Sequence, residues 1–385
     1  MQPAAERPER MNIGCDARAL VGERTGVGTW TERVMGGLAR SGFGTVMLAA
    51  SKTITLDPEE RHPGLVVLPP PRVPLLGPLW LNSVLPATLR RLEADVWVGA
   101  LAILPVRCPV PSVAMVHDLT PRTHPRRHTF ANRLVFRFFL EPSLRSARVV
   151  VAGSSATAAE ILAAFPWAEP KLEIIGYGVD EWYSPAPTDD DGGAVRRRFS
   201  EGRPYVLHLG TIEPRKGIPE LVAAWERLVR DRDEGPDLVI AGREGWQTGA
   251  ILDRVQASPL SARIHLTGYV SRHDARELLR HAAVFALASE VEGFGLPLAE
   301  AISCGTPAVA TDIPALREAG GDAALYCPHG DTEAFAAALA DALEPSTADR
   351  LRRLALERAP ELRWDPVVDA WADLLGRLNP PNGFV

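Results

Sequence analysis

The amino-acid sequence predicts an α/β fold made of two similar domains in tandem. Short apolar runs alternate with helix-length amphipathic stretches along the chain, which is the pattern of parallel strands covered by helices. This alternation is interrupted between residues 178 and 204, where proline, aspartate and glycine are concentrated. With 385 residues, the chain is long enough for two domains that each bury a core of their own.

The first half of the sequence has the pattern of seven strands and four helices. Each predicted strand is a short apolar run, and each predicted helix is a longer stretch that mixes apolar and polar residues. We expect the strands at Met11–Cys15, Thr45–Ala50, Leu65–Leu68, Asp95–Val98, Ser112–Val116, Arg148–Ala152 and Leu172–Ile175. We expect the helices at Gly28–Arg40, Leu81–Leu92, Phe130–Ser146 and Ser155–Ala164.

The same pattern restarts after the linker. Open parallel sheets bind ligands beyond the carboxyl ends of their strands, and two such sheets that face each other enclose a cleft, so the functional residues should follow strands. We expect strands at Tyr205–Gly210, Asp237–Ala241, Arg263–Leu266, Ala283–Leu287 and Ala308–Ala310. We expect helices at Ile218–Arg230, Arg272–His281 and Pro297–Cys304.

Composition and charge argue against several other classes of protein. The formal net charge of −6 argues against nucleic acid as a partner. No apolar run reaches the roughly 18 residues that a membrane-spanning helix needs, and the first ten residues lack the apolar core of a secretory signal. The four cysteines are Cys15, Cys108, Cys304 and Cys327. They are too scattered along the sequence to suggest a zinc site or a disulfide framework, which fits a cytoplasmic location.

The segment Arg122–Arg148 departs from the acidic balance of the chain. It contains a single acid, Glu141, and its basic and aromatic residues are Arg122, Arg126, Arg127, Arg133, Arg137, Arg145, Arg148, Phe130, Phe136, Phe138 and Phe139. Such a segment could dock on anionic lipid at the inner face of the membrane, or hold a lipid-diphosphate acceptor. The alternative is an ordinary helix whose phenylalanines face the core and whose arginines are solvated. The sequence leaves both interpretations open.

The motif T-I-E-P-R-K-G, residues 211–217, lies between a predicted strand and a predicted helix. Arg215 and Lys216 therefore stand beside backbone N–H groups and the positive end of a helix dipole, where a phosphate group is favoured. A solvated basic turn is the alternative.

Two further motifs follow predicted strands of the first domain. The stretch R-T-G-V-G-T-W, residues 24–30, is a glycine-rich turn before a helix, but Thr31 stands where the dinucleotide fingerprint has its third glycine. The stretch V-H-D-L-T-P places His117 and Asp118 at the carboxyl end of an apolar strand, as an active site would. A tight turn and a structural His–Asp pair are the respective alternatives.

The stretch S-E-V-E-G-F-G-L-P-L-A-E, residues 289–300, places Glu292 on a loop and Glu300 near the start of a helix. Pro297 suits the first helical turn, and the residues from Phe294 to Leu296 offer backbone amides at the helix N-terminus. A surface acid and a dipole-complementing helix residue would explain either carboxylate separately.

Taken together, these motifs resemble the retaining glycosyltransferases of family 4. E-G-F-G-L-P-L-A-E is similar to the E-x7-E motif of that family, with Glu292 and Glu300 in the two glutamate positions. Y-V-L-H-L-G-T-I-E-P-R-K-G resembles its donor-phosphate segment, V-H-D-L-T-P its N-domain catalytic segment, and T-G-V-G its first glycine loop. The resemblance extends from Met11 to about Leu378 and implies the GT-B fold, two Rossmann-like domains that face each other across a cleft.

The resemblance also implies a division into domains. Residues 1–180 would form the N-terminal, acceptor-side domain, and residues 181–363 the C-terminal domain that binds the donor nucleotide. The helix over residues 364–378 would cross back onto the first domain. In one departure from the family, Thr29 and Trp30 follow Gly28 where many members have a basic and an aromatic residue.

The resemblance further implies the roles of individual residues. Arg215 and Lys216, after Gly210, would neutralise the diphosphate leaving group, a task that a metal performs in other transferases. Glu300 would bind the ribose hydroxyls, and Glu292 would contact hydroxyls of the transferred sugar. His117 and Asp118 would belong to the catalytic segment, with His117 over the donor sugar. Further contacts with the donor are implied for Gly26, Gly28, Tyr269, Val270, Phe294, Gly295 and Leu296.

The implied reaction is transfer of a hexose from a nucleoside-diphosphate sugar to a saccharide or lipid-linked glycan, without a cofactor or metal and with retention of the anomeric configuration. The sequence looks closest to bacterial enzymes that use GDP-mannose, and UDP- and dTDP-linked sugars are the alternative donors. A GT-B-like sugar-nucleotide epimerase is the second enzyme class considered. A nicotinamide-binding protein is the third, although the incomplete glycine fingerprint speaks against it.

Overall fold

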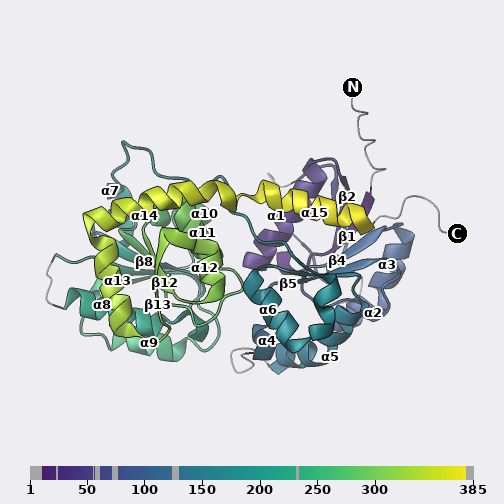
Figure 1. Cartoon of the computed structure of the whole chain (residues 1–385), viewed down its shortest axis with the longest axis horizontal. Helices are drawn as coiled ribbons and strands as arrows, with labels where there is room; N and C mark the ends of the chain where they lie inside the picture. Colours follow the sequence, from purple (N-terminus) through teal and green to yellow (C-terminus); the bar gives the residue numbers. More distant parts are fainter. Residues whose placement is uncertain are drawn as a thin grey trace. The chain divides into compact units, whose positions relative to one another are not determined.

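The computed structural model describes residues 11–22, 25–54, 56, 61–71, 77–123, 130–230 and 234–378. The chain divides into two compact units (Figure 1). Unit 1 comprises Met1–Gly178 together with Trp364–Val385, and unit 2 comprises Val179–Arg363. Each unit is a parallel sheet covered by helices, so the predicted α/β class with two Rossmann-like domains is confirmed.

Unit 1 is built on a seven-stranded parallel sheet with the order β3-β2-β1-β4-β5-β6-β7. Its strands are β1 (Met11–Asp16), β2 (Gly44–Ala49), β3 (Leu65–Val67), β4 (Val96–Gly99), β5 (Ser112–Val116), β6 (Val149–Ala152) and β7 (Leu172–Ile174). The central strands β4 and β5 are buried along their whole length, which is why they read as continuous apolar runs in the sequence.

The helices of unit 1 include one that was not predicted, Thr120–Thr123, and differ from the prediction around Pro86. They are α1 (Gly26–Arg40), α2 (Gly77–Ser83), α3 (Leu85–Arg91), α4 (Thr120–Thr123), α5 (Phe130–Ser146), α6 (Ser155–Ala164) and α15 (Trp364–Leu378). The single helix predicted over Leu81–Leu92 is wrong, because α2 ends at Ser83 and α3 begins at Leu85. Pro86 lies in the first turn of α3, where its missing N–H is tolerated, whereas inside a continuous helix it would break the hydrogen-bond ladder.

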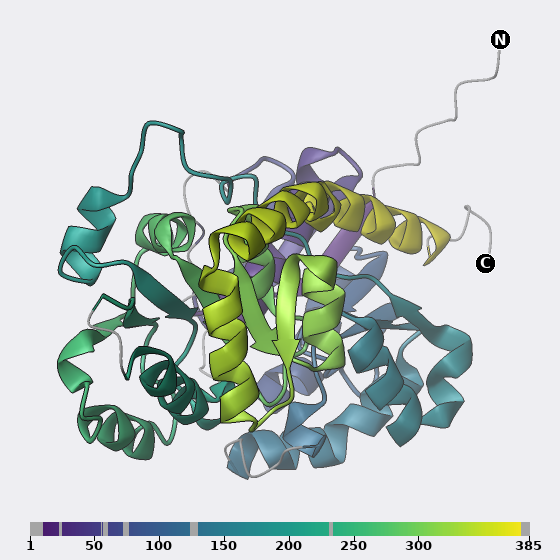
Figure 2. The same cartoon turned by 60° about the vertical axis from the view of Figure 1, so that its left-hand side comes forward.

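The C-terminal helix α15 is part of the core of unit 1. It packs against α1, and the two helices lie side by side in Figures 1 and 2. The rings of Trp30 and Trp371 meet edge to face with centroids 5.2 Å apart, and both side chains are fully buried. Gly37 allows this close approach, because a Cβ at that position would lie 2.5 Å from a methyl carbon of Val368.

Unit 2 is built on a six-stranded parallel sheet with the order β10-β9-β8-β11-β12-β13. Its strands are β8 (Tyr205–Leu209), β9 (Asp237–Ala241), β10 (Ile264–Gly268), β11 (Val284–Leu287), β12 (Ala308–Thr311) and β13 (Ala324–Cys327). Its helices are α7 (Gly193–Phe199), α8 (Ile218–Val229), α9 (Gly249–Gln256), α10 (Arg272–His281), α11 (Leu296–Ser303), α12 (Pro314–Gly320), α13 (Thr332–Leu343) and α14 (Pro345–Arg358). The sequence analysis did not identify β13, whose two central residues are only half-buried.

Among the described residues, no helix combines the length and the apolar character needed to cross a membrane.

Candidate active site

The cationic loop of unit 2 follows β8 and precedes α8. A short 3-10 helix, Pro214–Lys216, carries Arg215 and Lys216, and Gly217 then turns the chain into α8. Gly217 has a φ of +62°, and a Cβ there would lie 2.0 Å from the backbone oxygen of Ala288. Glycine is therefore required at the point where this loop packs against the residue that follows β11.

Arg215 and Lys216 are held side by side by Glu292. The Nζ atom of Lys216 donates to Oε1 of Glu292 at 2.5 Å, and Nη1 of Arg215 donates to Oε2 at 3.1 Å. Ser289 adds a hydrogen bond from its hydroxyl to Oε1 at 2.7 Å. Arg215 forms a second ion pair, with Glu213 at 2.7 Å. One carboxylate thus binds both cations through different oxygens and offsets their mutual repulsion.

Burial and charge set the protonation of this cluster. Burial alone would raise the pKa of Glu292, but the charges of Lys216 and Arg215 outweigh that effect and lower the pKa to about 2. Burial lowers the pKa of Lys216, although Glu292 opposes this shift. Glu292 is therefore ionised at neutral pH. The family resemblance implies that Glu292 contacts the transferred sugar, and in the structure its carboxylate oxygens bind Lys216, Arg215 and Ser289.

Glu300 has a different environment. It lies in the second turn of α11 and is half-buried. Burial raises its pKa to about 8, with the charge of Asp180 adding to the increase, while Tyr183 and Arg272 oppose it. Near neutral pH, Glu292 is therefore ionised while Glu300 is largely protonated. The sequence does not predict this difference, because both residues are glutamates.

Several other predicted donor residues lie at the same edge of the unit 2 sheet, because the carboxyl ends of parallel strands share one edge. Gly210 directly follows β8, and Tyr269 and Val270 directly follow β10. Tyr269 is 63% exposed. The peptide groups of Phe294, Gly295 and Leu296 lie at the start of α11, where Gly295 has a φ of +105°.

His117 lies at the carboxyl end of β5 in unit 1 and is fixed by two hydrogen bonds. Its Nε2 lies 2.8 Å from the carbonyl oxygen of Ala100, and its Nδ1 lies 2.6 Å from the hydroxyl of Tyr177. Burial lowers the pKa of His117 to about 4, so the ring is neutral at neutral pH. A carbonyl oxygen only accepts, so Nε2 carries the proton and Nδ1 accepts a hydrogen bond from Tyr177.

Asp118 does not form the other half of a hydrogen-bonded pair with His117 in this structure. Its Oδ1 instead accepts hydrogen bonds from the backbone N–H of Thr120 at 2.9 Å and from the Thr120 hydroxyl at 2.6 Å. These two bonds hold Asp118 against the first residue of the short helix α4.

The glycine loop of unit 1 leads into α1. Gly26 and Gly28 are in the first turn of this helix, and the side chain of Thr25 caps it by accepting a hydrogen bond from the N–H of Gly28. Arg24 lies outside the described residues. Trp30 is fully buried and meets the ring of His117 edge to face at 5.2 Å, so it supports the position of that histidine.

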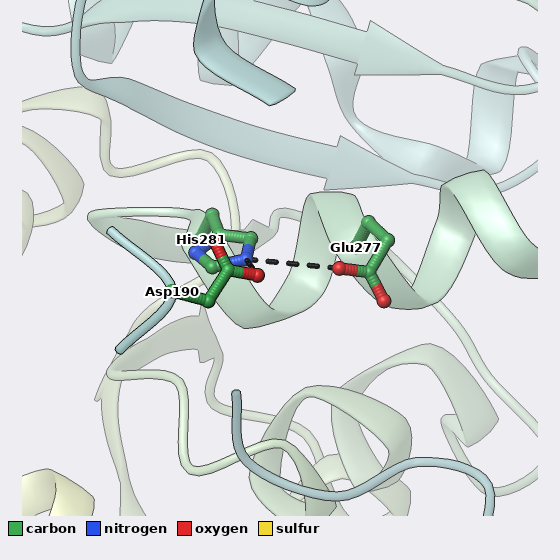
Figure 3. A group of neighbouring side chains, drawn as sticks. All are labelled: Asp190, Glu277 and His281. Carbon is green, nitrogen blue, oxygen red and sulfur yellow. Dashed lines mark hydrogen bonds and ion pairs between the residues drawn. The ribbon is translucent and has the colours of Figure 1, made fainter. Parts of the chain in front are cut away.

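One group of side chains with metal-ligand chemistry was not anticipated. In the part of the chain that the structure describes, Asp190, Glu277 and His281 place one ligand atom each within 4.8 Å of one another (Figure 3). Nε2 of His281 lies 3.1 Å from Asp190 and 3.7 Å from Glu277. Glu277 also pairs with Arg276 and Arg280, so positive charge already balances the acids. The group lies at the end of α10 that precedes β11, which is the opposite edge of the sheet from the cationic loop.

The predicted site residues are thus divided between the units. His117, Asp118, Gly26 and Gly28 belong to unit 1, and the remaining predicted residues belong to unit 2. Four residues of the site were not predicted from the sequence: Tyr177, Tyr183, Glu213 and Ser289. Glu213 and Ser289 lie inside motifs quoted above, whereas Tyr177 precedes the linker, Tyr183 lies within it, and neither carries a motif signal.

Two Rossmann-like domains, the second with a cationic loop after its first strand, match the fold of the GT-B glycosyltransferases. Residues 24–183 match the family model described as Glycosyltransferase Family 4, and residues 195–358 match the one described as Glycosyl transferases group 1. The chain belongs to the glycosyltransferases that these models describe, which confirms the predicted family and the predicted enzyme class.

Three known proteins illustrate the similarity. The O-antigen chain mannosyltransferase B of Escherichia coli is 28% identical over 258 residues, which are 66% of this chain and 67% of the relative. The α-maltose-1-phosphate synthase of Mycolicibacterium smegmatis is 28% identical over 255 residues, which are 62% of this chain and 64% of the relative. The solved structure of Anabaena HepE, in complex with UDP and glucose, matches with a TM-score of 0.77 at 20% identity. The match covers 96% of this chain and 100% of the HepE chain. The alignments with the two relatives thus span about two thirds of their length.

Proposed function

We propose that this glycosyltransferase moves a mannosyl group from GDP-mannose to a hydroxyl of a saccharide or lipid-linked glycan, in the cytoplasm or at the inner face of the membrane. The observation that carries the proposal is the pair Arg215 and Lys216, held side by side by Glu292 at the carboxyl edge of the unit 2 sheet. The similarity to an O-antigen chain mannosyltransferase favours mannose. The similarity to a structure in complex with UDP and glucose supports a UDP-linked sugar as the alternative donor.

In the proposed reaction, the bond between the anomeric carbon and the diphosphate breaks, and a bond from the acceptor oxygen to that carbon forms. Negative charge develops on the departing diphosphate, and Arg215 and Lys216 would stabilise it through charge-assisted hydrogen bonds. The charge-assisted hydrogen bonds that Arg215 and Lys216 would donate to the diphosphate are our reason to propose that no metal is required. Attack from the face that the leaving group vacates retains the configuration, and the leaving phosphate takes the proton of the acceptor.

The glutamates would have distinct roles in this reaction. Glu292 would keep the two cations together. It would also contact hydroxyls of the transferred sugar. Glu300 would bind the ribose hydroxyls. With a pKa of about 8, its carboxyl group can donate a hydrogen bond to a hydroxyl as well as accept one.

A thermal-shift screen against GDP-mannose, UDP-glucose and a dTDP-linked sugar tests the choice of donor, because the true donor stabilises the folded chain by mass action. Mass spectrometry of a glycan acceptor should then show the gain of one hexose. An isomerised donor with an unchanged acceptor would instead indicate an epimerase and overturn the proposal.

The double variant Arg215→Ala, Lys216→Ala tests the diphosphate assignment, and we expect it to abolish transfer. Arg352→Ala, Arg353→Ala on the exposed face of α14 is the matched control, which should transfer at the normal rate. Normal kinetics in the first variant would remove the assignment. Transfer that survives dialysis against EDTA would support metal independence.

A further inference from the structure

The exposed face of α5 carries apolar side chains that the core of unit 1 does not use. Phe130 is 70% exposed, Leu134 43% and Phe138 59%. These residues are four positions apart, so they form one stripe along the helix. We call Phe130, Leu134 and Phe138 the α5 stripe. Single exposed apolar side chains are ordinary, but three in a line on one helix mark an interaction surface.

The opposite side of α5 already provides the packing that holds the helix in place. Leu140 and Leu144 are buried in the core of unit 1, and Phe136 and Phe139 pack against the same core. The hydroxyl of Ser143 also accepts a hydrogen bond from the backbone N–H of Leu104 at 2.9 Å. The four phenylalanines of the basic segment therefore divide between two faces, and neither interpretation of the sequence describes all of them.

Two arginines accompany the stripe. Arg133 and Arg137 are exposed, and each immediately precedes a residue of the stripe, so they lie along its flank. Neither has an ion-pair partner among the described residues. Arg145 differs, because it pairs with Glu141 at 2.8 Å. The guanidinium of Arg122 lies 4.8 Å from the ring centre of Phe165, and Arg126 and Arg127 lie outside the described residues.

We propose that this face of α5 docks on an anionic phospholipid surface. Phenylalanine and leucine would enter the boundary between headgroups and acyl chains, while Arg133 and Arg137 would bind lipid phosphates. Charge complementarity selects this occupant over a neutral surface. The whole chain has a net charge of −6, so an anionic surface repels most of the protein and the α5 face would determine its orientation. The surface belongs to unit 1, and its docking does not depend on which sugar the donor carries.

Co-sedimentation of the full chain with vesicles tests the proposal. We expect binding to an equal mixture of phosphatidylglycerol and phosphatidylcholine, much weaker binding to phosphatidylcholine alone, and loss of binding as salt is raised. Phe130→Gln, Leu134→Gln, Phe138→Gln should weaken binding by about 100-fold, because three side chains lose their apolar contact with lipid. Arg133→Gln, Arg137→Gln should weaken it by about 30-fold. Glutamine is a good helix former, so α5 should persist, and circular dichroism checks this.

A matched control is available on α14 of unit 2. Leu356 is 49% exposed there, beside the exposed Arg352 and Arg353. Leu356→Gln with Arg352→Gln and Arg353→Gln should bind vesicles like the unmodified chain. Equal binding by the stripe variant and the unmodified chain, or no binding by either, would overturn the proposal. The proposal would also be overturned if the unmodified chain is a dimer in solution and the stripe variant is a monomer, because a second copy of the chain would then cover this face. Transfer to a soluble saccharide acceptor should be unchanged in every α5 variant, which separates this result from a failure of the proposed reaction.

Discussion

Replacement of Glu292 by glutamine should destabilise unit 2 by an amount that the site geometry allows us to estimate. The pKa of Glu292 falls from its ordinary value of 4.5 to about 2, because Lys216 and Arg215 outweigh the effect of burial. A fall of this size corresponds to roughly 3 kcal/mol of stability at neutral pH. Burial of Lys216 opposes part of it, so we expect Glu292→Gln to lower the free energy of unfolding by about 2–3 kcal/mol.

The pH dependence provides the sharper test. Since the pKa is lower in the folded state, the stabilisation is complete above pH 4.5 and is lost as the pH falls toward 2. Thermal unfolding followed by circular dichroism should show a midpoint roughly 4–10 °C lower for Glu292→Gln at neutral pH, and this difference should shrink in acid. Glu357→Gln removes an exposed acid of α14 and should change little. A variant that melts with the unmodified chain at neutral pH would refute the reasoning.

Three further predictions concern other parts of the site. Tyr177→Phe should remove the hydrogen bond to Nδ1 of His117 and lower the free energy of unfolding by about 1–2 kcal/mol, as measured in thermal melts. It should also shift the ¹⁵N NMR resonances of the His117 ring. Unchanged resonances would contradict the assigned tautomer. Burial raises the pKa of Glu300 to about 8, so in the folded chain this carboxyl group keeps its proton up to about that pH, and the stability of the chain should fall as the pH rises from 4.5 to 8. Thermal melts of Glu300→Gln should lack this decline. An equal decline in the variant would contradict the raised pKa. In the same assay, Gly217→Ala should destabilise the protein by more than about 2 kcal/mol, because the new Cβ would lie 2.0 Å from a backbone oxygen. The control Gly330→Ala has nothing within 4 Å of its Cβ and should cost about 1 kcal/mol. Equal losses in the two variants would contradict the predicted clash at Gly217.

The features that the sequence predicted correctly depend on local patterns. Apolar runs bounded by glycine and proline identified most strands of both sheets, and the helix expected over residues 364–378 is α15. The loop from Gly210 to Gly217 was also predictable, because glycine permits backbone conformations that other residues avoid and proline fixes φ, whatever residues lie beside them. Errors arose where a signal was weak, as at the half-buried strand β13, or where one proline divided a helix.

The environments of the site residues depend on contacts between distant parts of the chain, and the sequence alone did not reveal them. Lys216 and Glu292 are 76 positions apart, and nothing in either motif shows that they bind each other. The pKa of Glu300 depends on Asp180 and Tyr183, which come from the linker. Trp30 was noted only as a departure from the family, and its role as a buried support for His117 required the position of α15.

The packing of α15 on α1 has a consequence for how the protein is made. Most of unit 1 is translated before unit 2, but unit 1 lacks one of its core helices until Trp364–Leu378 has been made. At ordinary rates of synthesis, the ribosome needs roughly 10 to 40 s to make Val179–Arg363 in between. During that interval the face of Trp30 that later meets Trp371 stays uncovered, while the continuous unit 2 can fold as soon as it emerges. The first half of the chain is therefore the half that depends longest on protection from aggregation.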